Sequence, residues 1–311
     1  MTTNTLDGNE ERMNAPSISK TVAVLGAGTM GSAMTRSLLR AGIIPVVWDR
    51  SKERTDSLAS SGAIVAESAA DAAHDASILI TMVTDADAVI AIAEEHGMID
   101  ALAPGAIWAQ MSTIGIRGFD RVAAMASARR PDVLLVDAPV SGSRAPAEQG
   151  ALTIFASGPA EARDRLQPVF NALGHRTLWL GPAGLGSRVK LVNNVLLAFL
   201  AQGLGEAVSI AHDFGLSTQT VIDAVGDGAL SSPWLAGKLQ RMARDDYSAE
   251  FALALALKDV TLAAGEIDQS QHPVLRSLVT QWRDAAGAGL GEYDLTVIAQ
   301  FLRSDPQKGV T

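Results

Sequence analysis

The stretch TVAVLGAGTMGSAMTRSLLR, residues 21–40, decides how the first half of the chain folds. Its first part, TVAVL, is typical of a buried strand, and three glycines follow in the spacing GxGxxG at Gly26, Gly28 and Gly31. The first glycine permits a tight turn, the second lets the backbone approach a bound group, and the third lets a helix pack on the strand. The stretch therefore predicts a strand, a glycine loop and a helix in direct succession.

A helix that begins behind such a loop offers unpaired N–H groups and a positive dipole end to phosphates. We therefore interpret the loop as a dinucleotide-binding site, with a glycine-rich turn that binds nothing as the alternative; its residues are Gly26, Ala27, Gly28, Thr29, Met30 and Gly31. The second strand, IPVVW, ends at Asp49, whose carboxylate can accept hydrogen bonds from ribose hydroxyls and so favours NAD. Arg50, Ser51 and Arg54 follow and can hold a 2′-phosphate, which favours NADP. Ser51 can also be a helix N-cap, which is compatible with either cofactor, so the sequence leaves NAD(P)H unresolved.

Short apolar runs alternate with helical segments over residues 20–181. The runs SILITMV (77–83), AIWAQM (106–111) and VLLVDAP (133–139) are apolar enough for strands buried on both faces. This alternation predicts an α/β, Rossmann-type domain with a doubly wound, mostly parallel sheet. We expect ALTIFASG (151–158) and TLWLG (177–181), with a helix between them, to extend the same sheet.

The β-rich runs stop after Gly181. Residues 188–215 read as one long, largely buried helix, and further segments with helical spacing follow. We therefore expect an all-helical domain over residues 182–305, joined to the first domain by a long interdomain helix. Residues 1–19 are polar and acidic, have no apolar core of a secretory signal, and read as a flexible tail.

The composition excludes several classes of function. The chain has 311 residues, is 48% hydrophobic and 19% charged, and carries a formal net charge of −9, which argues against nucleic acids and anionic membranes as partners. It has no cysteine, and its five histidines form no metal-binding spacing, so we expect no metal. No apolar run approaches the roughly 18 residues needed to span a bilayer, and we expect a cytoplasmic protein.

With no cysteine and no metal-binding histidines, a proton donor or acceptor must come from another type of side chain. The Tyr-x-x-x-Lys pair of short-chain dehydrogenases is absent, since neither tyrosine has a lysine four positions later. Lys190 lies near the start of the long helix, and Asn194 lies one turn later on the same face. Either both are buried, as a catalytic pair would be, or both face solvent. The segment DAPVSGS (137–143) is a strand followed by a glycine loop, whose N–H groups and Ser141 hydroxyl either hold an anion or form an ordinary turn.

Four blocks in this order resemble the β-hydroxyacid dehydrogenase family, which includes 3-hydroxyisobutyrate and tartronate-semialdehyde enzymes. They are the glycine loop, DAPVSGSRAPAEQGALTIFASG (137–158), GLGSRVKLVNN (184–194) and Lys258-Asp259, so the resemblance extends over residues 21–302. The segment PVSGSRAPAE (139–148), together with Phe251 eight residues before Asp259, is most similar to the glyoxylate/succinic semialdehyde reductase branch. Members of that branch generally prefer NADPH and carry Asn where this chain has Asp49.

The resemblance implies a role for each matching residue. Lys190 matches the catalytic lysine, and Asn194 matches the asparagine that assists it. Ser141 and Gly142 match the residues that hold the substrate carboxylate, and the full set of implied substrate contacts is Ser141, Gly142, Ser143, Thr113, Phe251 and Asp259. The implied cofactor contacts beyond the glycine loop are Asp49, Arg50, Ser51, Met82, Val83, Thr113 and Lys258.

The function implied by the resemblance is reversible hydride transfer between NAD(P)H and a small carboxylate-bearing substrate. That substrate would be a β-hydroxy acid or aldehyde acid such as glyoxylate, succinic semialdehyde or 3-hydroxyisobutyrate, and the protein would be a homodimer or homotetramer. An imine reductase on the same scaffold and a non-catalytic NAD(P)-binding protein are the alternatives, and Lys190 counts against both. Arg144, beside the carboxylate loop, either admits a second acidic group of the substrate or faces solvent.

Overall fold

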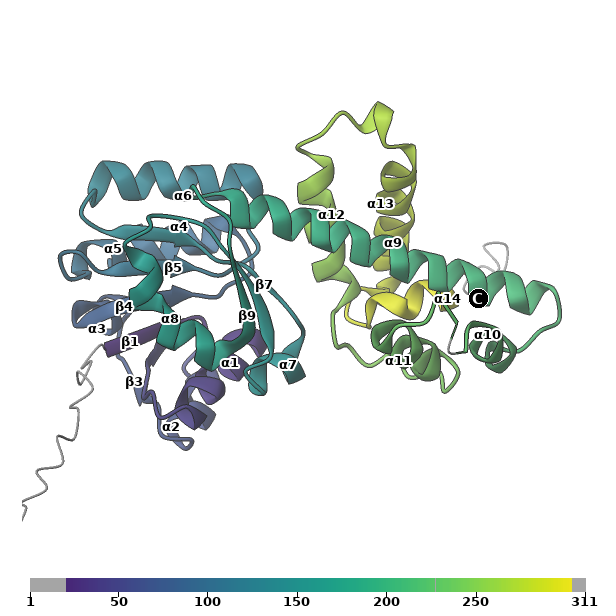
Figure 1. Cartoon of the computed structure of the whole chain (residues 1–311), viewed down its shortest axis with the longest axis horizontal. Coiled ribbons are helices and arrows are strands. Elements are labelled where there is room, and N and C mark those ends of the chain that lie inside the picture. The colour runs from purple at the N-terminus through teal and green to yellow at the C-terminus, as the bar shows by residue number, and fades with distance from the viewer. Residues whose placement is uncertain (1–20, 227, 304–311) are drawn as a thin grey trace, which may run out of the picture.

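The structure, a computed structural model, describes residues 21–226 and 228–303, so the tail expected over residues 1–19 lies outside the described residues. Figure 1 shows a sheet domain and a helical domain, with the long helix α9 (Leu185–Asp213) running from one into the other. The expected class, a Rossmann-type α/β domain followed by an all-helical domain, is confirmed.

The first domain is built on a six-stranded, fully parallel sheet with the strand order β3-β2-β1-β4-β5-β6. Its strands are β1 (Thr21–Leu25), β2 (Val46–Trp48), β3 (Ile64–Val65), β4 (Ala76–Thr81), β5 (Ile107–Gln110) and β6 (Leu134–Asp137). From β1 the chain adds β2 and β3 on one side and then crosses over to add β4, β5 and β6 on the other side, so the strand order reverses between β1 and β4. In open parallel sheets, ligands bind at such a switch point, beyond the carboxyl ends of the strands.

Helices cover both faces of this sheet because its strands are apolar on both sides. In β1, Val22 and Val24 face one core and Ala23 and Leu25 face the other. The first core is covered by α1 (Thr29–Arg40), α2 (Glu53–Ala59), α7 (Arg144–Glu148) and α8 (Ala162–Leu173). The second core is covered by α3 (Ala69–His74), α4 (Ala86–Glu94), α5 (Met98–Ala101) and α6 (Gly115–Arg129).

The last three strands form a sheet of their own, so our expectation that residues 151–158 and 177–181 extend the first sheet was wrong. They are β7 (Val140–Ser141), β8 (Leu152–Ala156) and β9 (Gly174–Trp179), and β7 runs antiparallel to β8. The two sheets meet at an isolated bridge between Asp137 and Ser157. Pro139 lies two residues after the end of β6 and has no N–H to donate to a strand ladder.

The second domain is helical. It consists of α9, α10 (Thr218–Val225), α11 (Pro233–Met242), α12 (Leu253–Ala264), α13 (Pro273–Ala285), α14 (Ile298–Arg303), the 3₁₀ turns Gln269–Gln271 and Leu295–Val297, and the single π turn Ala286–Leu290. Trp282 and Val260 are fully buried in its core.

Helix α9 connects the two domains. It packs on β8 and α6 in the first domain and on α12 and α14 in the second. By length and composition α9 is apolar enough to cross a membrane, which our reading of the sequence had missed. Its contacts with both domains and its buried polar residues Lys190 and Asn194 identify it as a core helix of the protein.

Candidate active site

The glycine loop lies at the carboxyl end of β1, and each glycine has a separate structural reason. Gly26 has φ +105°, and a Cβ there would lie 2.3 Å from the Met82 carbonyl oxygen. A Cβ on Gly31 would lie 1.8 Å from the Gly26 oxygen, so only glycine lets α1 approach β1. Gly28 faces open space and provides no side-chain cap for α1, which leaves the first N–H groups of the helix free for a ligand. The loop therefore fits a pyrophosphate.

Asp49 lies at the end of β2, beside this loop. Its carboxylate accepts hydrogen bonds from the N–H of Ala27, at 2.7 Å, and from the N–H of Ser51, at 2.9 Å. The Ser51 hydroxyl donates to the Glu53 carboxylate at 2.7 Å, and the Arg54 guanidinium lies 3.8 Å from Asp49. Two carboxylates, Asp49 and Glu53, therefore flank the place where a 2′-phosphate would lie, while Arg50 is exposed.

Met82 and Val83 follow β4 and pack against the glycine loop. The Val83 N–H donates to the Ser112 hydroxyl at 2.8 Å, which holds this turn against the one after β5. Ser112 in turn donates its N–H to the side-chain oxygen of Gln110 at 2.7 Å, and Gln110 donates back to the Ser112 carbonyl at 2.9 Å. These paired hydrogen bonds between Gln110 and Ser112 were not predicted from the sequence, although a glutamine at the end of a buried strand was a visible signal. They fix the turn that carries Thr113.

The start of α9 is anchored to the sheet domain by a buried carboxylate. Asp137, at the end of β6, accepts hydrogen bonds from the N–H and the hydroxyl of Ser187, at 2.7 and 2.8 Å. A negative charge is favourable at a helix N-terminus. Burial raises the pKa of Asp137 to about 6, against the hydrogen bonds from Ser187 and Ser157, which lower it. Neither Asp137 nor Ser187 was predicted from the sequence to have a role of its own.

Gly186 lies in close contact with β8, and this contact determines which face of α9 packs on the sheet domain. A Cβ there would lie 2.2 Å from the Phe155 carbonyl oxygen of β8, so only glycine allows this approach. Lys190 and Asn194 follow at intervals of four residues and therefore share that face. Of the two alternatives for this pair, burial is the one observed, with relative exposures of 9% and 3%.

The Lys190 ammonium has no hydrogen-bond or ion-pair partner within residues 21–226 and 228–303. Burial lowers its pKa to about 8; the Asp259 carboxylate opposes this shift and the Lys258 ammonium adds to it. A lysine with such a pKa changes protonation state close to neutral pH. Titratable groups shifted in this way are enriched at catalytic sites.

Four more of the expected site residues form one connected chain beside Lys190. Asn194 donates to Asp259 Oδ2 at 2.5 Å, and the Lys258 ammonium lies 2.9 Å from Asp259 Oδ1. Lys258 also donates to the Thr113 carbonyl at 2.6 Å, which ties α12 to the turn after β5. The ion pair is not aligned as a hydrogen bond, so Asp259 Oδ1 accepts none from the described residues. A buried acceptor is thus left for a ligand or a water molecule.

Ser141, Gly142 and Ser143 lie at the end of β7 and the start of α7. Gly142 has φ +131°, a backbone conformation that favours glycine. Neither serine hydroxyl makes a hydrogen bond to another described residue, so both are free to bind an anion. Helix α9 contacts β7, which brings this loop to the Lys190 side of the sheet domain. Arg144 is exposed and pairs with Glu148 at 3.0 Å, as expected of a charge that faces solvent.

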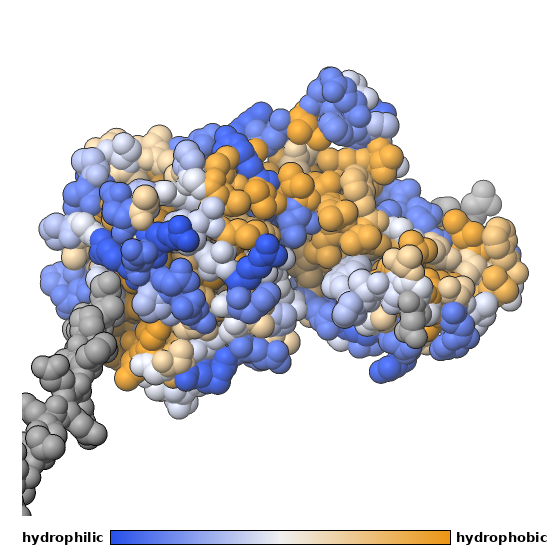
Figure 2. Space-filling model, viewed as in Figure 1, coloured by the Kyte–Doolittle hydropathy of each residue, from blue (hydrophilic) through white to orange (hydrophobic). Residues whose placement is uncertain are grey.

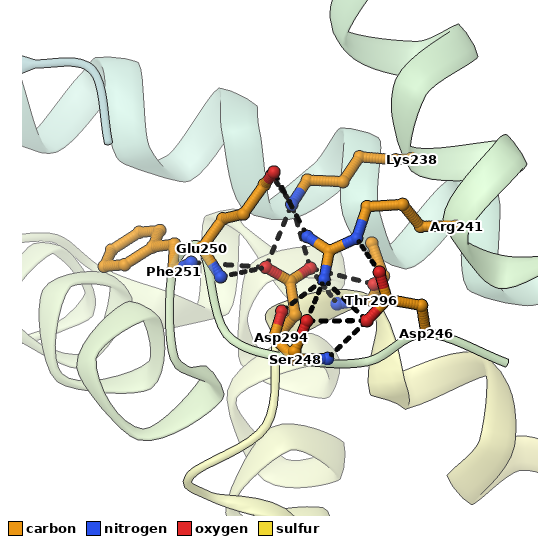
Figure 3. Close-up of polar contacts among 8 residues, drawn as sticks. All are labelled: Lys238, Arg241, Asp246, Ser248, Glu250, Phe251, Asp294 and Thr296. Atoms are coloured by element: carbon orange, nitrogen blue, oxygen red, sulfur yellow. Dashed lines mark hydrogen bonds and ion pairs between the residues drawn. The ribbon is translucent and has the colours of Figure 1, made fainter. Parts of the chain in front are cut away.

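Phe251 lies in the segment before α12, where a charged cluster holds its backbone (Figure 3). Its N–H and that of Glu250 donate to Asp294 at 3.2 and 3.1 Å, and the buried Lys238 ammonium binds both Asp294 oxygens. Burial opposes ionisation of Asp294, but Lys238 and these hydrogen bonds outweigh it and hold the pKa of Asp294 below its usual value. Phe251 is therefore fixed in the helical domain, and within the described part of the chain no hydrogen bond joins it to Lys190, Asn194, Asp259, Lys258 or Thr113.

A glycine loop on a Rossmann sheet and a buried, unpaired lysine on the interdomain helix define a nicotinamide-dependent dehydrogenase. A family model of the NAD-binding domain of 6-phosphogluconate dehydrogenase matches residues 21–181. A second model, the NAD-binding domain of NADP-dependent 3-hydroxyisobutyrate dehydrogenase, matches residues 184–302. The chain belongs to the β-hydroxyacid dehydrogenase family and is an NAD(P)-dependent 3-hydroxyacid dehydrogenase, as the motifs predicted.

Individual relatives agree with this assignment. The chain is 30% identical over 285 residues to glyoxylate/succinic semialdehyde reductase 1 of Arabidopsis thaliana, covering 91% of this chain and 98% of the relative. It is 32% identical over 300 residues to the NAD-dependent L-serine dehydrogenase of Pseudomonas aeruginosa, covering 93% and 99%. The solved structure of Mycobacterium tuberculosis 3-hydroxyisobutyrate dehydrogenase with L-serine matches with a TM-score of 0.80 at 26% identity, covering 92% and 99%. Neither a nucleic acid nor a membrane is indicated for this chain by these relatives.

Proposed function

We propose that this enzyme interconverts a small carboxylate-bearing hydroxy acid and the corresponding oxo or aldehyde acid, with Lys190 as the proton donor and acceptor. The observation that carries the proposal is the Lys190 ammonium, which is buried, lacks a partner among the described residues and has a pKa of about 8. A general acid or base works best when its pKa lies near the working pH. The names of the relatives suggest glyoxylate, succinic semialdehyde, 3-hydroxyisobutyrate and L-serine as candidate substrates.

A bound nicotinamide supplies or accepts the hydride. In the reductive direction Lys190 Nζ donates its proton to the oxygen of the carbonyl group, and in the oxidative direction the neutral amine removes the proton from the hydroxyl. Proton transfer by a positioned side chain is worth about 10²–10⁴ in rate. Because Lys190 has no acceptor among its described neighbours, its proton is available to a substrate oxygen.

Asn194 and Asp259 hold the surroundings of Lys190 in place. The Asp259 carboxylate raises the pKa of Lys190 against the effect of burial, which keeps the lysine protonated near neutral pH. Asn194 is bonded to Asp259 on one side and accepts from Asn193 at 3.1 Å on the other, so its amide is oriented before substrate arrives. Preorganisation of this kind stabilises charge that develops in the transition state.

The substrate carboxylate binds at Ser141 and Gly142 in this proposal. The free serine hydroxyl and the loop N–H groups supply donors, and nothing among the described residues offers a metal site that would polarise the carbonyl instead. Ser143 and Phe251 border the substrate, and Thr113, Met82, Val83 and Lys258 line the cofactor. Binding energy from the carboxylate is thereby used to orient the reacting carbon.

For the cofactor we propose a preference for NADH. The carboxylates of Asp49 and Glu53 would repel a 2′-phosphate, and the charge of Arg54 is already paired with Asp49. Arg50 and Ser51 supply the opposing attraction, so both cofactors are expected to bind measurably. We further propose a cytoplasmic homodimer or homotetramer with a sheet domain over 20–181 and a helical domain over 182–305.

A substrate panel tests the proposed function. Oxidation of NADH and NADPH is followed with glyoxylate and succinic semialdehyde, and the reverse reaction with L-serine and 3-hydroxyisobutyrate. We expect at least one acid to be turned over with a kcat/KM at least about a hundredfold above that of its amide or ester. An analogue without the carboxylate leaves the hydrogen-bond donors of the site without a partner, and such analogues are rejected strongly. Equal efficiencies for acid and amide would contradict the carboxylate site and favour an imine reductase.

A further inference from the structure

The sheet domain and the helical domain meet along a seam between residues 113–117 and one face of α12. At one end of the seam, Lys258 donates to the Thr113 carbonyl. In its middle, a Cβ on Gly115, which has φ +76°, would lie 3.1 Å from a methyl carbon of Leu262, so glycine lets the two backbones approach. Lys258, Leu262 and the end of α12 follow one another at intervals of three to four residues and therefore lie on the same side of the helix.

Arg117 and Glu266 close the other end of the seam. The Arg117 guanidinium donates to the Gly265 carbonyl at 3.0 Å, and its Nε lies 3.3 Å from one Glu266 carboxylate oxygen. The other oxygen of that carboxylate accepts from the backbone N–H of Arg117 at 3.4 Å. The Glu266 side chain is 19% exposed and that of Arg117 is 76% exposed, so the carboxylate lies within the seam and the guanidinium lies at its rim.

Each of these two charges stands at the unfavourable end of its own helix. Arg117 lies in the first turn of α6, at the positive end of the dipole, and Glu266 follows the last turn of α12, at the negative end. The first turn of α6 holds no acidic residue and the last turn of α12 holds no basic one. Across the seam the arrangement is reversed, because Glu266 faces the positive end of α6 and Arg117 binds a carbonyl at the negative end of α12. Both charges are therefore well placed only while the two helices remain together.

We infer that Arg117 and Glu266 are positioning residues for the reaction. They hold α12 at the place where its Asp259 reaches the site around Lys190. Figure 2 shows apolar side chains gathered along the middle of the molecule, where α9 passes from one domain to the other, but apolar contact is non-directional and does not fix the angle between two helices. Hydrogen bonds between charged groups are directional and do so. The inference rests on the proposed function, because the pair acts on the chemistry through α12.

Charge reversal at the pair tests the inference. Arg117→Glu sets two carboxylates against each other, so we expect kcat to fall by at least about fivefold, the factor by which an exposed ion pair shifts an equilibrium. When Arg117→Glu is combined with Glu266→Arg, the charges attract again and each stands at the favourable end of its own helix, so kcat should return to within about twofold of the wild type.

The matched control is Arg121→Glu, one turn further along α6. Arg121 pairs with Asp87 at 2.9 Å inside the sheet domain, so its reversal produces the same kind of repulsion away from the seam. We expect kcat of this variant to equal that of the wild type. A control variant that loses as much activity as Arg117→Glu would contradict the inference.

A double-mutant cycle separates positioning from a general loss of structure. If Arg117 acts through Asp259, Arg117→Glu should change kcat by less than about twofold in a chain that already carries Asp259→Asn, because the effects of coupled residues do not add. A structural effect alone would lower kcat by the same factor in both backgrounds and would overturn the positioning role.

Amide hydrogen exchange gives a readout that does not depend on turnover. We expect faster exchange in the first turn of α6 and the last turn of α12 in Arg117→Glu, and exchange like that of the wild type at both places in Arg121→Glu. Unchanged exchange in Arg117→Glu, or an unchanged kcat, would overturn the positioning role while the proposed function stands. A wild type that turns over none of the acids would overturn both.

Discussion

Replacing Lys190 with Met separates the chemical role of the lysine from its packing. Methionine keeps an unbranched side chain of similar volume but has no proton to give, so kcat should fall by at least about a hundredfold, the lower limit for a lost general acid. In the wild type the pKa of about 8 means that one lysine in ten is protonated at pH 9. The reductive rate should therefore fall about tenfold per pH unit above pH 8, and the variant should lack this dependence.

The variant should remain at least as stable as the wild type, because a buried ammonium without a partner destabilises the folded chain. The folded pKa lies below the unfolded value of 10.5, so the unfolded chain binds the extra proton between about pH 8 and 10.5. The free energy of unfolding should thus rise with pH across this window in the wild type and not in the variant. Steady-state kinetics, urea unfolding and NADH titration measure these effects. Turnover within a factor of a few of the wild type, with unchanged NADH affinity, would refute a catalytic role for Lys190.

Three further changes test the surroundings of the site. Asp259→Asn removes the carboxylate that raises the pKa of Lys190, so the pH at which reduction declines should move below 8; an unmoved profile would show that the two do not interact. Asp49→Asn combined with Glu53→Gln should shift the ratio of NADPH to NADH affinity towards NADPH by at least about tenfold in a fluorescence titration, since two repulsive charges are lost. A ratio that stays constant would assign cofactor choice to other residues. Gly186→Ala places a Cβ 2.2 Å from a carbonyl oxygen of β8, so urea unfolding should show a loss of about 1–3 kcal/mol, and a neutral result would mean that α9 is not seated as described.

The local pattern was sufficient to predict the strands of the main sheet from sequence, except β3, whose two residues are exposed. Each strand of the main sheet that is apolar on both faces was recognisable, because burial on both faces removes polar residues from the strand itself. The glycine loop was equally clear, since its three glycines are required by contacts within a single strand–turn–helix unit. The position of β7, β8 and β9 was not predictable in this way. Whether a strand joins one sheet or begins another depends on partners distant in sequence, and here β8 pairs with β7 and β9 and meets the first sheet at a single isolated bridge.

The same distinction holds for the candidate active site. The sequence by itself determined which side chains are candidates, because Lys190 and Asn194 share a helix face at a fixed spacing. Only the tertiary structure decided that this face is buried, that Asp137 anchors it, and that Asp259 from a helix 65 residues further along the chain meets Asn194. Burial and charge at a site come from segments that are brought together by packing, and both set the pKa of Lys190. The identity of the residues is therefore local information, whereas their reactivity is a property of the folded chain.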